Sequence, residues 1–253
     1  FSAYRSEFRE LLDQSVHDAA GASTPAAFLS GGTDSSTVVG VLTSLRKTSV
    51  ETFSIGFEAD GFDEMEYVRC AAERFKSSSH EYYLKPQDIV DAVPVIAAAY
   101  DEPVGNSSAV PTYFCAKRAR EAGFKTMLAG DGGDEIFGGN ARYAKQRAFE
   151  AYSHLPAFLR KGLIEPVSRL PGLSQQFPLR KLRSYVDQAN IPLPLRLETY
   201  NFLHRTPLAE IFEPGFIGAV DPTSTDRALS EVYARTRTDH YINRLMHVDL
   251  KFT

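Results

Sequence analysis

Residues 25–36 are PAAFLSGGTDSS, and this stretch decides the fold. Pro25–Leu29 is a short apolar run, which predicts a buried strand. Two glycines follow it, and Asp34–Leu45 then has the character of a helix. A strand, a glycine-rich turn and a helix in direct succession are typical of the βαβ units that build parallel sheets. The stretch therefore predicts an α/β fold.

The same alternation continues to about residue 130. Further strands are expected at Glu51–Phe57, His80–Leu84 and Lys125–Ala129, and further helices at Ser2–Ala20, Asp63–Phe75, Gln87–Tyr100 and Ala109–Ala122. Four short strands separated by helices predict a twisted parallel sheet flanked by helices. Such sheets bind ligands at the carboxyl ends of their strands. Unusual loops, 30–36 and 130–139, follow the first and fourth strands.

Glycine and proline divide the chain unequally. Thirteen of the 17 glycines lie in residues 1–150, and nine of the 14 prolines lie after residue 150. The first part has glycine-rich turns between strands and helices, whereas the second has helical segments separated by proline. We therefore expect an α/β core over 1–150 and a helical region over 151–253.

Composition excludes several classes of protein. Lys and Arg number 28 against 32 Asp and Glu, a net charge of -4 that argues against a nucleic-acid binder. A transmembrane helix needs roughly 18 apolar residues, and the longest apolar run, Ala92–Tyr100, contains Pro94. Cys70 and Cys115 show no metal or disulfide spacing, which fits a reducing cytoplasm. Because the first residue is Phe1, we expect the chain to be part of a longer protein.

The first loop has the composition of a phosphate-binding turn. Gly31 and Gly32 allow backbone N–H groups to turn toward an anion, and the following helix N-terminus favours negative charge. Ser30, Ser35 and Ser36 add hydroxyl donors. The loop lacks the Gly-Lys-Ser/Thr ending of a Walker A motif and is not G-x-G-x-x-G. It therefore indicates a different class of phosphate site.

Asp34 is the informative residue of this loop. A carboxylate beside bound phosphates would repel them unless a divalent cation bridged the two, which predicts Mg²⁺. The alternative is that Asp34 is only a helix N-cap and that the glycines form only a turn. The string S-G-G-x-D-S resembles the PP-loop ATP pyrophosphatases. That resemblance implies cleavage of ATP between its α- and β-phosphates, with adenylation of a substrate.

The second loop places three carboxylates within five residues and surrounds them with five glycines. Like charges this close repel one another unless a cation relieves the repulsion. An EF-hand does not fit, because the sixth position counted from Asp131 is Ile136 and the twelfth is Arg142. A solvated acidic turn is the plain alternative. The apolar pair Ile136-Phe137 instead predicts that the loop packs against the protein.

Five segments taken together resemble the synthetase domain of glutamine-dependent asparagine synthetases. They are FLSGGTDSS at 28–36, FSIGF at 53–57, DEP at 101–103, SSAVPT at 107–112 and GDGGDEIFGG at 130–139. Their order and separations also match, over most of residues 1–150. The resemblance implies an adenine nucleotide α hydrolase-like (PP-loop) core there, and over 151–253 a helical continuation of the same domain, truncated at its C-terminus.

The resemblance also implies an ATP site. The adenosine would be held by backbone at Leu29 and Ile55, with Ala129 and Gly130 near the ribose and α-phosphate. The family often has Ser where this chain has Ala129, so one hydroxyl contact is expected to be missing. The residues implied to cradle the pyrophosphate are Ser30, Gly31, Gly32 and Ser35.

Carboxylates receive the remaining implied roles. Asp34 and Asp134 would be ligands of Mg²⁺. Asp131 matches the position of the family's proposed general base, which is often Glu. Glu135 is a second candidate for the same acidic site. For Glu102, contact with substrate and a structural role both stay open.

The implied reaction has two steps. The β-carboxylate of aspartate attacks the α-phosphorus of ATP, and ammonia then attacks the carbonyl of β-aspartyl-AMP. The expected partners are ATP, aspartate, ammonia, the N-terminal glutaminase domain of a full-length protein and a second copy of the chain in a homodimer. No nucleic acid and no membrane are expected, and the expected compartment is the cytoplasm.

Two departures from the family's pattern lower the expected activity. The glutaminase nucleophile is a cysteine at the mature N-terminus, whereas this chain starts at Phe1, so glutamine hydrolysis is expected to be absent. The family also has a pyrophosphate-binding lysine in a Lys-Val-Asp-Arg-Met-Ser-like segment. Residues 245–251, LMHVDLK, resemble the stretch just before it, so Lys251 is not expected to be that lysine. We therefore expect weak ATP binding and slow turnover.

Two alternatives to an asparagine-forming ligase stay open. One is another amidating or cyclising PP-loop enzyme, such as a β-lactam synthetase-like protein. The other is a catalytically inert nucleotide-binding module, against which the intact acidic loop and Asp34 argue.

Overall fold

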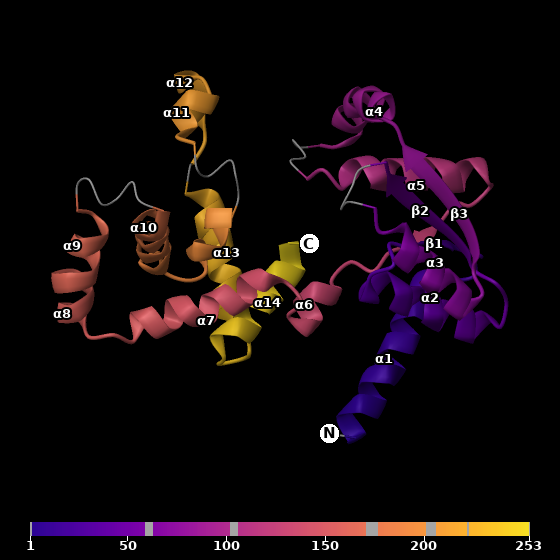
Figure 1. Ribbon diagram of the computed structural model, residues 1–253, viewed down its shortest axis with the longest axis horizontal. Helices are drawn as coiled ribbons and strands as arrows, with labels where there is room; N and C mark the ends of the chain where they lie inside the picture. Colours follow the sequence, from indigo (N-terminus) through magenta and orange to yellow (C-terminus); the bar gives the residue numbers. More distant parts are fainter. Residues whose placement is uncertain are drawn as a thin grey trace. The chain divides into compact units, whose positions relative to one another are not determined.

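The computed structural model describes residues 2–58, 63–101, 106–170, 177–200, 206–221 and 223–252 (Figure 1). By its internal contacts the chain divides into two compact units, Phe1–Asp131 and Gly132–Thr253. The division near residue 150 was expected from glycine and proline content, a different criterion, and stays a prediction.

The first unit contains a parallel sheet of four strands in the order β3-β2-β1-β4. The strands are β1 (Ala26–Phe28), β2 (Glu51–Phe57), β3 (Ser78–Leu84) and β4 (Met127–Leu128). The helices are α1 (Ser2–Ala20), α2 (Thr33–Arg46), α3 (Met65–Phe75), α4 (Pro86–Ala99) and α5 (Ala109–Glu121). The expected α/β class with a helix-flanked parallel sheet is confirmed.

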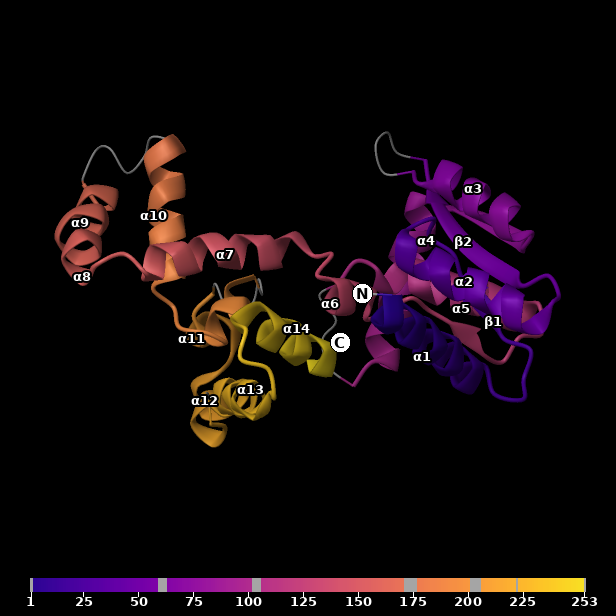
Figure 2. The same ribbon diagram turned by 90° about the horizontal axis from the view of Figure 1, so that it is seen from below.

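Alternation along β1 assigns the helices to two faces, because successive strand side chains point to opposite sides. Ala27 and Leu29 pack with α2 and α3 on one face, and α1 lies outside them against α2 (Figure 2). Ala26 and Phe28 pack with α5 on the other face, and α4 contacts α5. Ala26 and Ala27 are fully buried, as parallel sheets covered on both faces require.

Strand order reverses beside β1. The chain passes from β1 to β2 to β3 in one direction, and β4 then lies on the other side of β1. Such a reversal is a topological switch point, and the crevice outside the strand ends there is where open α/β sheets bind ligands. The backbone after β1 and the backbone after β4 both leave the sheet at this point. The topology therefore places the first loop and the start of the second loop at the same edge.

The second unit is helical in its described part, as expected. Its helices are α6 (Gly133–Phe137), α7 (Ala141–Ser153), α8 (Ala157–Leu159), α9 (Glu165–Ser168), α10 (Phe177–Ala189), α11 (Leu208–Ile211), α12 (Pro214–Ala219), α13 (Ser224–Arg235) and α14 (Tyr241–Phe252), with a π-helical turn at Arg160–Ile164 and a 3₁₀ turn at Leu195–Tyr200. None of the described helices in either unit combines the length and the apolar character that crossing a bilayer requires.

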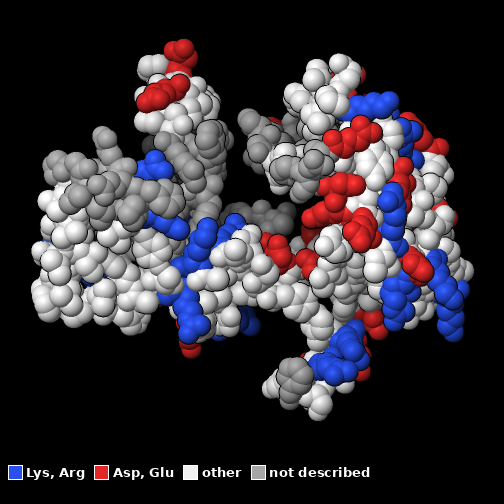
Figure 3. Space-filling model, in the orientation of Figure 1, with Lys and Arg blue, Asp and Glu red and all other residues white. Residues whose placement is uncertain are grey.

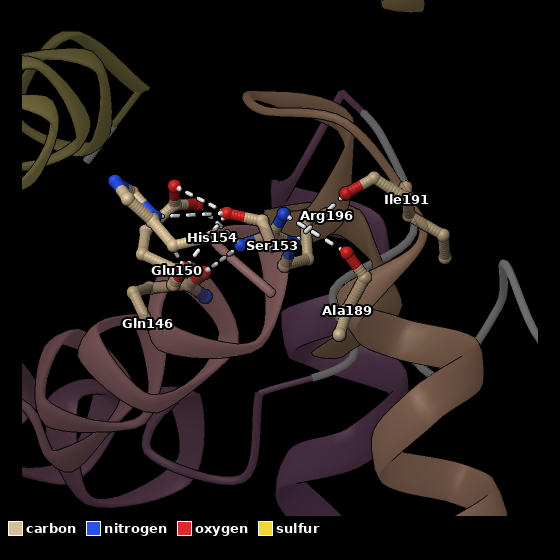
Figure 4. A network of polar contacts seen from close by, with 7 residues as sticks. All are labelled: Gln146, Glu150, Ser153, His154, Ala189, Ile191 and Arg196. Carbon is tan, nitrogen blue, oxygen red and sulfur yellow. Dashed lines mark hydrogen bonds and ion pairs between the residues drawn. The ribbon is translucent and has the colours of Figure 1, made fainter. Parts of the chain in front are cut away.

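A buried arginine ties three of these elements together (Figure 4). Arg196 is 3% exposed and donates from Nη1 to Glu150 Oε1 at 2.9 Å and to Gln146 Oε1 at 3.3 Å. Its Nε donates to the carbonyl of Ile191 at 2.8 Å, and its Nη2 to the carbonyl of Ala189 at 3.2 Å. A buried charge is tolerated when it is paired and hydrogen-bonded, so this network joins α7 to the end of α10 and to the 3₁₀ turn.

Candidate functional site

The first loop is shaped by a close approach to α3. Gly31 has φ +80°, and a Cβ placed there would lie 2.6 Å from Tyr67 Cβ and 2.7 Å from Val68 N. Both the left-handed conformation and the lack of space exclude a side chain at this position. The loop is therefore held against the first turn of α3 by its backbone.

Two serines stabilise the loop from within. Ser35 Oγ accepts a hydrogen bond from the Ser30 N–H at 3.1 Å and lies 3.0 Å from Ser30 Oγ. Ser30 Oγ in turn accepts from the Gly32 N–H at 3.3 Å. Within the described residues the Ser36 hydroxyl oxygen is buried but has no hydrogen-bond partner. Ser30 and Ser35 thus shape the turn, and Ser36 keeps an unused donor beside it.

The N-terminus of α2 is open to an anion. Gly32, not Asp34, occupies the N-cap position and makes no side-chain cap, so the first-turn N–H groups stay available. These groups and the helix dipole favour a phosphate. Asp34 lies in the first turn and is partly exposed, and its role as a magnesium ligand stays a prediction. The alternative that Asp34 is merely an N-cap is wrong.

Gly130 brings the end of β4 against this same turn. A Cβ at Gly130 would lie 2.6 Å from Ser35 N and 2.7 Å from the carbonyl carbon of Asp34. Only backbone fits in that space. Ala129 and Asp131, on either side of Gly130, are exposed. Within the first unit the structure therefore brings the β4 loop together with the first turn of α2.

Of the two residues implied for adenosine, Leu29 directly follows β1 and Ile55 lies in β2. The Leu29 N–H donates to the Phe53 carbonyl at 3.2 Å, and the Leu29 carbonyl accepts from Ser54 Oγ at 2.6 Å. A carbonyl oxygen has a second lone pair, so Leu29 keeps one acceptor site. Ile55 lies in β2, paired with Tyr82 of β3, and is partly exposed. Their role toward adenosine stays a prediction.

Asp134 lies in α6 of the second unit and is exposed. Its carboxylate folds back over Gly139, where Oδ1 occupies the space that a Cβ would need. The Gly139 N–H donates to the Asp134 carbonyl at 3.0 Å. Gly139 is therefore the residue that allows this position of the Asp134 side chain.

In α6 the charged residue Glu135 is buried and the apolar residues Ile136 and Phe137 are exposed, which is the reverse of the expected arrangement. Glu135 is 9% exposed, whereas Ile136 and Phe137 are 52% and 66% exposed. Successive residues of a helix point about 100° apart, and the inward position of α6 faces Arg142, whose Nη2 lies 3.7 Å from Glu135 Oε1. The loop packs against α14, as expected, but Glu135 and not the pair Ile136-Phe137 holds the inward position.

Arg142 also contacts α14, which the sequence did not reveal. Arg142 Nη2 lies 2.8 Å from Asp249 Oδ2, and the Tyr143 hydroxyl donates to the same oxygen at 2.6 Å. Burial raises the pKa of Asp249, although Tyr143 and Arg142 act in the opposite direction. Burial and the Asp249 carboxylate also raise the pKa of Tyr143. More than 100 residues separate the partners, so no local pattern indicates them.

The magnesium site stays a prediction. Among the described residues, no group of three or more His, Cys, Asp and Glu side chains is gathered to hold a metal ion. Asp34 belongs to the first unit and Asp134 to the second. Glu102 lies outside the described residues, so both interpretations of it stay open. On the face of the first unit drawn in Figure 3, acidic and basic side chains lie interspersed.

Comparison with known proteins gives consistent matches. The asparagine synthase family model matches residues 7–253. The chain is 42% identical to a putative glutamine-hydrolyzing asparagine synthetase 2 of Methanocaldococcus jannaschii. The alignment is 159 residues long and covers 61% of this chain and 30% of the relative. It is also 31% identical to a putative glutamine-hydrolyzing asparagine synthetase of Mycobacterium tuberculosis. That alignment is 230 residues long and covers 90% of this chain and 33% of the relative.

A third relative is the glutamine-hydrolyzing asparagine synthetase 1 of Bacillus subtilis, 31% identical over 166 residues, 65% of this chain and 26% of the relative. The chain thus spans at most about a third of the length of these relatives. The match to the family model, in contrast, extends over nearly the whole chain. The chain therefore belongs to the asparagine synthase family.

Proposed function

We propose that this chain is the ATP-dependent synthetase part of an asparagine-forming ligase. The observation that carries the proposal is the contact of Gly130 with the first turn of α2. It joins two glycine-rich loops at the switch point of a parallel sheet, where this architecture binds ligands. The family membership supports the same assignment.

The proposed reaction begins with adenylation. An oxygen of the aspartate β-carboxylate attacks the α-phosphorus of ATP, the bond from that phosphorus to the bridging oxygen breaks, and pyrophosphate leaves. Ammonia then attacks the acyl carbon of β-aspartyl-AMP, and the bond from that carbon to the AMP oxygen breaks. Asparagine, AMP and one proton are released.

In this proposal the first loop binds the pyrophosphate portion of ATP. The N–H groups of the first turn of α2 and of Gly31 donate to phosphate oxygens. Gly32, whose N–H already donates to Ser30 Oγ, has no side chain to obstruct the phosphate, and the Ser30 and Ser35 hydroxyls maintain the turn and add contacts. Because the turn is already formed without a ligand, little reorganisation accompanies binding. Alignment and charge stabilisation of this kind supply most of the rate in phosphorus transfer.

Three carboxylates complete the proposed site. Asp34 and Asp134 would hold Mg²⁺, whose charge offsets that of the phosphates when it is bound. Asp131 would take a proton from the ammonium adduct formed by ammonia. The proposed partners are a glutaminase domain that supplies ammonia and a second copy of the chain.

Two measurements test the proposal. The wild-type chain is expected to bind ATP in a Mg²⁺-dependent manner and to exchange labelled pyrophosphate into ATP, slowly, when aspartate is present. Exchange only with another carboxylic acid would favour a β-lactam synthetase-like enzyme. Asp34→Asn is expected to weaken Mg²⁺-dependent ATP binding at least about tenfold, which corresponds to about 1.4 kcal/mol.

A matched variant controls for the loss of one negative charge. Asp18 is an exposed residue of α1 and lies outside both glycine-rich loops. Asp18→Asn is expected to bind MgATP like the wild type. If Asp34→Asn also binds normally, the chain is an inert nucleotide-binding module and the proposed function is wrong.

A further inference from the structure

The segment that carries Asp134 cannot hold its own conformation. Helix α6 has only five residues, and isolated helices of fewer than about 12 residues are not stable in water. It is also bounded by Gly132 at φ +88° and Gly138 at φ +67°, where the chain turns sharply. The position of Asp134 must therefore come from what α6 contacts.

Helix α14 supplies apolar contacts at both ends of α6. A Cβ at Gly132 would lie 3.1 Å from Leu250 Cδ1, and one at Gly138 would lie 3.8 Å from Met246 Sδ. The two glycines thus let α14 approach the α6 backbone closely. Residues 246 and 250 are one turn apart, so a single face of α14 covers the segment.

A shared cation connects the same two helices. Arg142 of α7 lies between Glu135 of α6, at 3.7 Å, and Asp249 of α14, at 2.8 Å. The side chains of Glu135 and Asp249 are 9% and 10% exposed, and that of Arg142 is 27% exposed. Tyr143 donates a further hydrogen bond to Asp249. Removing one member of such a buried group leaves its partners without compensation.

We infer that Asp249 and Arg142 are positioning residues that orient Asp134 through Glu135 and α6. Asp134 adjoins Glu135 in a helix of little more than one turn, so rotation of α6 moves both side chains together. This inference rests on the proposed function, in which Asp134 holds Mg²⁺. Neither positioning residue is assigned a contact with ATP or the metal.

The test uses Asp249→Asn in the whole chain. The amide keeps the size of the side chain and an acceptor for Tyr143 but removes the charge that pairs with Arg142. Amide hydrogen exchange over residues 132–139, measured without ligand, is expected to become about tenfold faster, while exchange over residues 30–36 stays unchanged. The Mg²⁺ concentration that half-saturates ATP binding is expected to rise about tenfold.

The matched control is Asp187→Asn. Asp187 is 46% exposed and pairs at the surface of the same unit with Arg169 at 3.3 Å, so the control removes an equal charge from a solvated ion pair. It is expected to change neither measurement. Arg142→Lys, which keeps the charge but loses the planar fork, is expected to give intermediate values and serves if Asp249→Asn fails to fold.

The outcomes separate the two proposals. Unchanged exchange over 132–139 in a folded Asp249→Asn variant overturns the inference. Faster exchange with an unchanged Mg²⁺ requirement also overturns it, because Asp249 would then stabilise the fold without orienting the metal ligand. If the wild type itself lacks Mg²⁺-dependent ATP binding, the proposed function fails, and the exchange measurement still decides whether Asp249 holds the segment.

Discussion

Two glycines at the candidate site are required for different physical reasons. Gly31 has a left-handed backbone conformation, and a Cβ at this position would also collide with Tyr67. Gly130 has no positive φ, and its constraint is the approach of the β4 loop to the backbone of Asp34 and Ser35. The first glycine shapes one loop, whereas the second brings two loops together.

Gly130→Ala is expected to separate the loops. The added methyl would lie well inside van der Waals contact with backbone, which cannot yield as a flexible side chain can, so the free energy of unfolding should fall by about 1–3 kcal/mol. MgATP affinity should fall at least about tenfold, because the turn at α2 must shift. Denaturant unfolding and ATP titration measure both effects.

Gly162→Ala is the control for this change. A Cβ at Gly162 meets nothing within 4 Å. It should leave affinity and stability close to wild type. A Gly130→Ala variant that binds MgATP normally would show that the loop contact does not support the site.

At the scale of elements, buried polar groups decide how helices join. Arg196 pairs with Glu150 of α7 and donates to carbonyls at the end of α10 (Figure 4). The exposed pair Arg235–Glu231 of α13 lies at 3.3 Å, with its side chains 79% and 63% exposed. The first pair fixes a junction, whereas water competes with the second.

Arg196→Met is expected to destabilise the second unit by about 3 kcal/mol, since the buried carbonyl of Ala189 and the partly buried carbonyl of Ile191 lose their donor and an unpaired buried group costs about 1–3 kcal/mol. Arg235→Met should change the free energy of unfolding by less than about 1 kcal/mol. Urea unfolding of both variants checks the comparison. Equal effects would mean that the buried network does not hold the junction.

A buried thiol lies where α5 packs on β2. Cys115 donates through Sγ to the Phe53 carbonyl at 3.6 Å, and burial raises the pKa of this thiol to about 12 from an ordinary value of 9.0. The unfolded chain therefore ionises first as pH rises. The contribution to stability is complete below pH 9 and is lost progressively between pH 9 and about 12.

Cys115→Ala should remove this pH dependence. From pH 8 to pH 10 the wild type should lose about 1.4 kcal/mol more of its unfolding free energy than the variant does. Subtracting the unfolding free energy of the variant from that of the wild type at each pH removes the contribution of the tyrosines, which both proteins contain. Parallel pH profiles would show that the thiol does not ionise differently in the folded protein.

At the scale of the molecule, the order β3-β2-β1-β4 places the ends of β1 and β4 side by side. Helix α2 then points its N-terminus at that edge, with Asp34 in its first turn. A ligand that binds there contacts only the folded protein, so its binding should appear as added stability.

MgATP at about 100 times its dissociation constant should raise the free energy of unfolding by about 2.7 kcal/mol. Chelation of Mg²⁺ with EDTA should abolish the gain, because the carboxylates would then face the phosphates without a cation. A thermal shift assay with ATP alone, MgATP, and MgATP plus EDTA measures this. Equal stabilisation by ATP with and without Mg²⁺ would contradict the proposed role of Asp34.

Local segments were predictable from sequence, because their signals act between near neighbours. The apolar run before Ser30 and the glycines after it predicted β1, its turn and α2, and the strand at Glu51–Phe57 was predicted with its observed bounds. The bounds of a short strand were predicted less accurately. The strand expected at Lys125–Ala129 is only Met127–Leu128, and in the described part of the chain it pairs with β1 at the edge of the sheet.

The sequence by itself determined the α/β class, the helical second part and which loops carry glycine and carboxylate. Tertiary structure alone decided that Gly130 meets the first turn of α2, that Glu135 faces inward and that Asp249 pairs with Arg142. The physical reason is the distance along the chain over which each kind of interaction acts. Strand periods and glycine turns are set within a few residues, whereas the partner of a buried charge is chosen by packing between segments far apart in the chain.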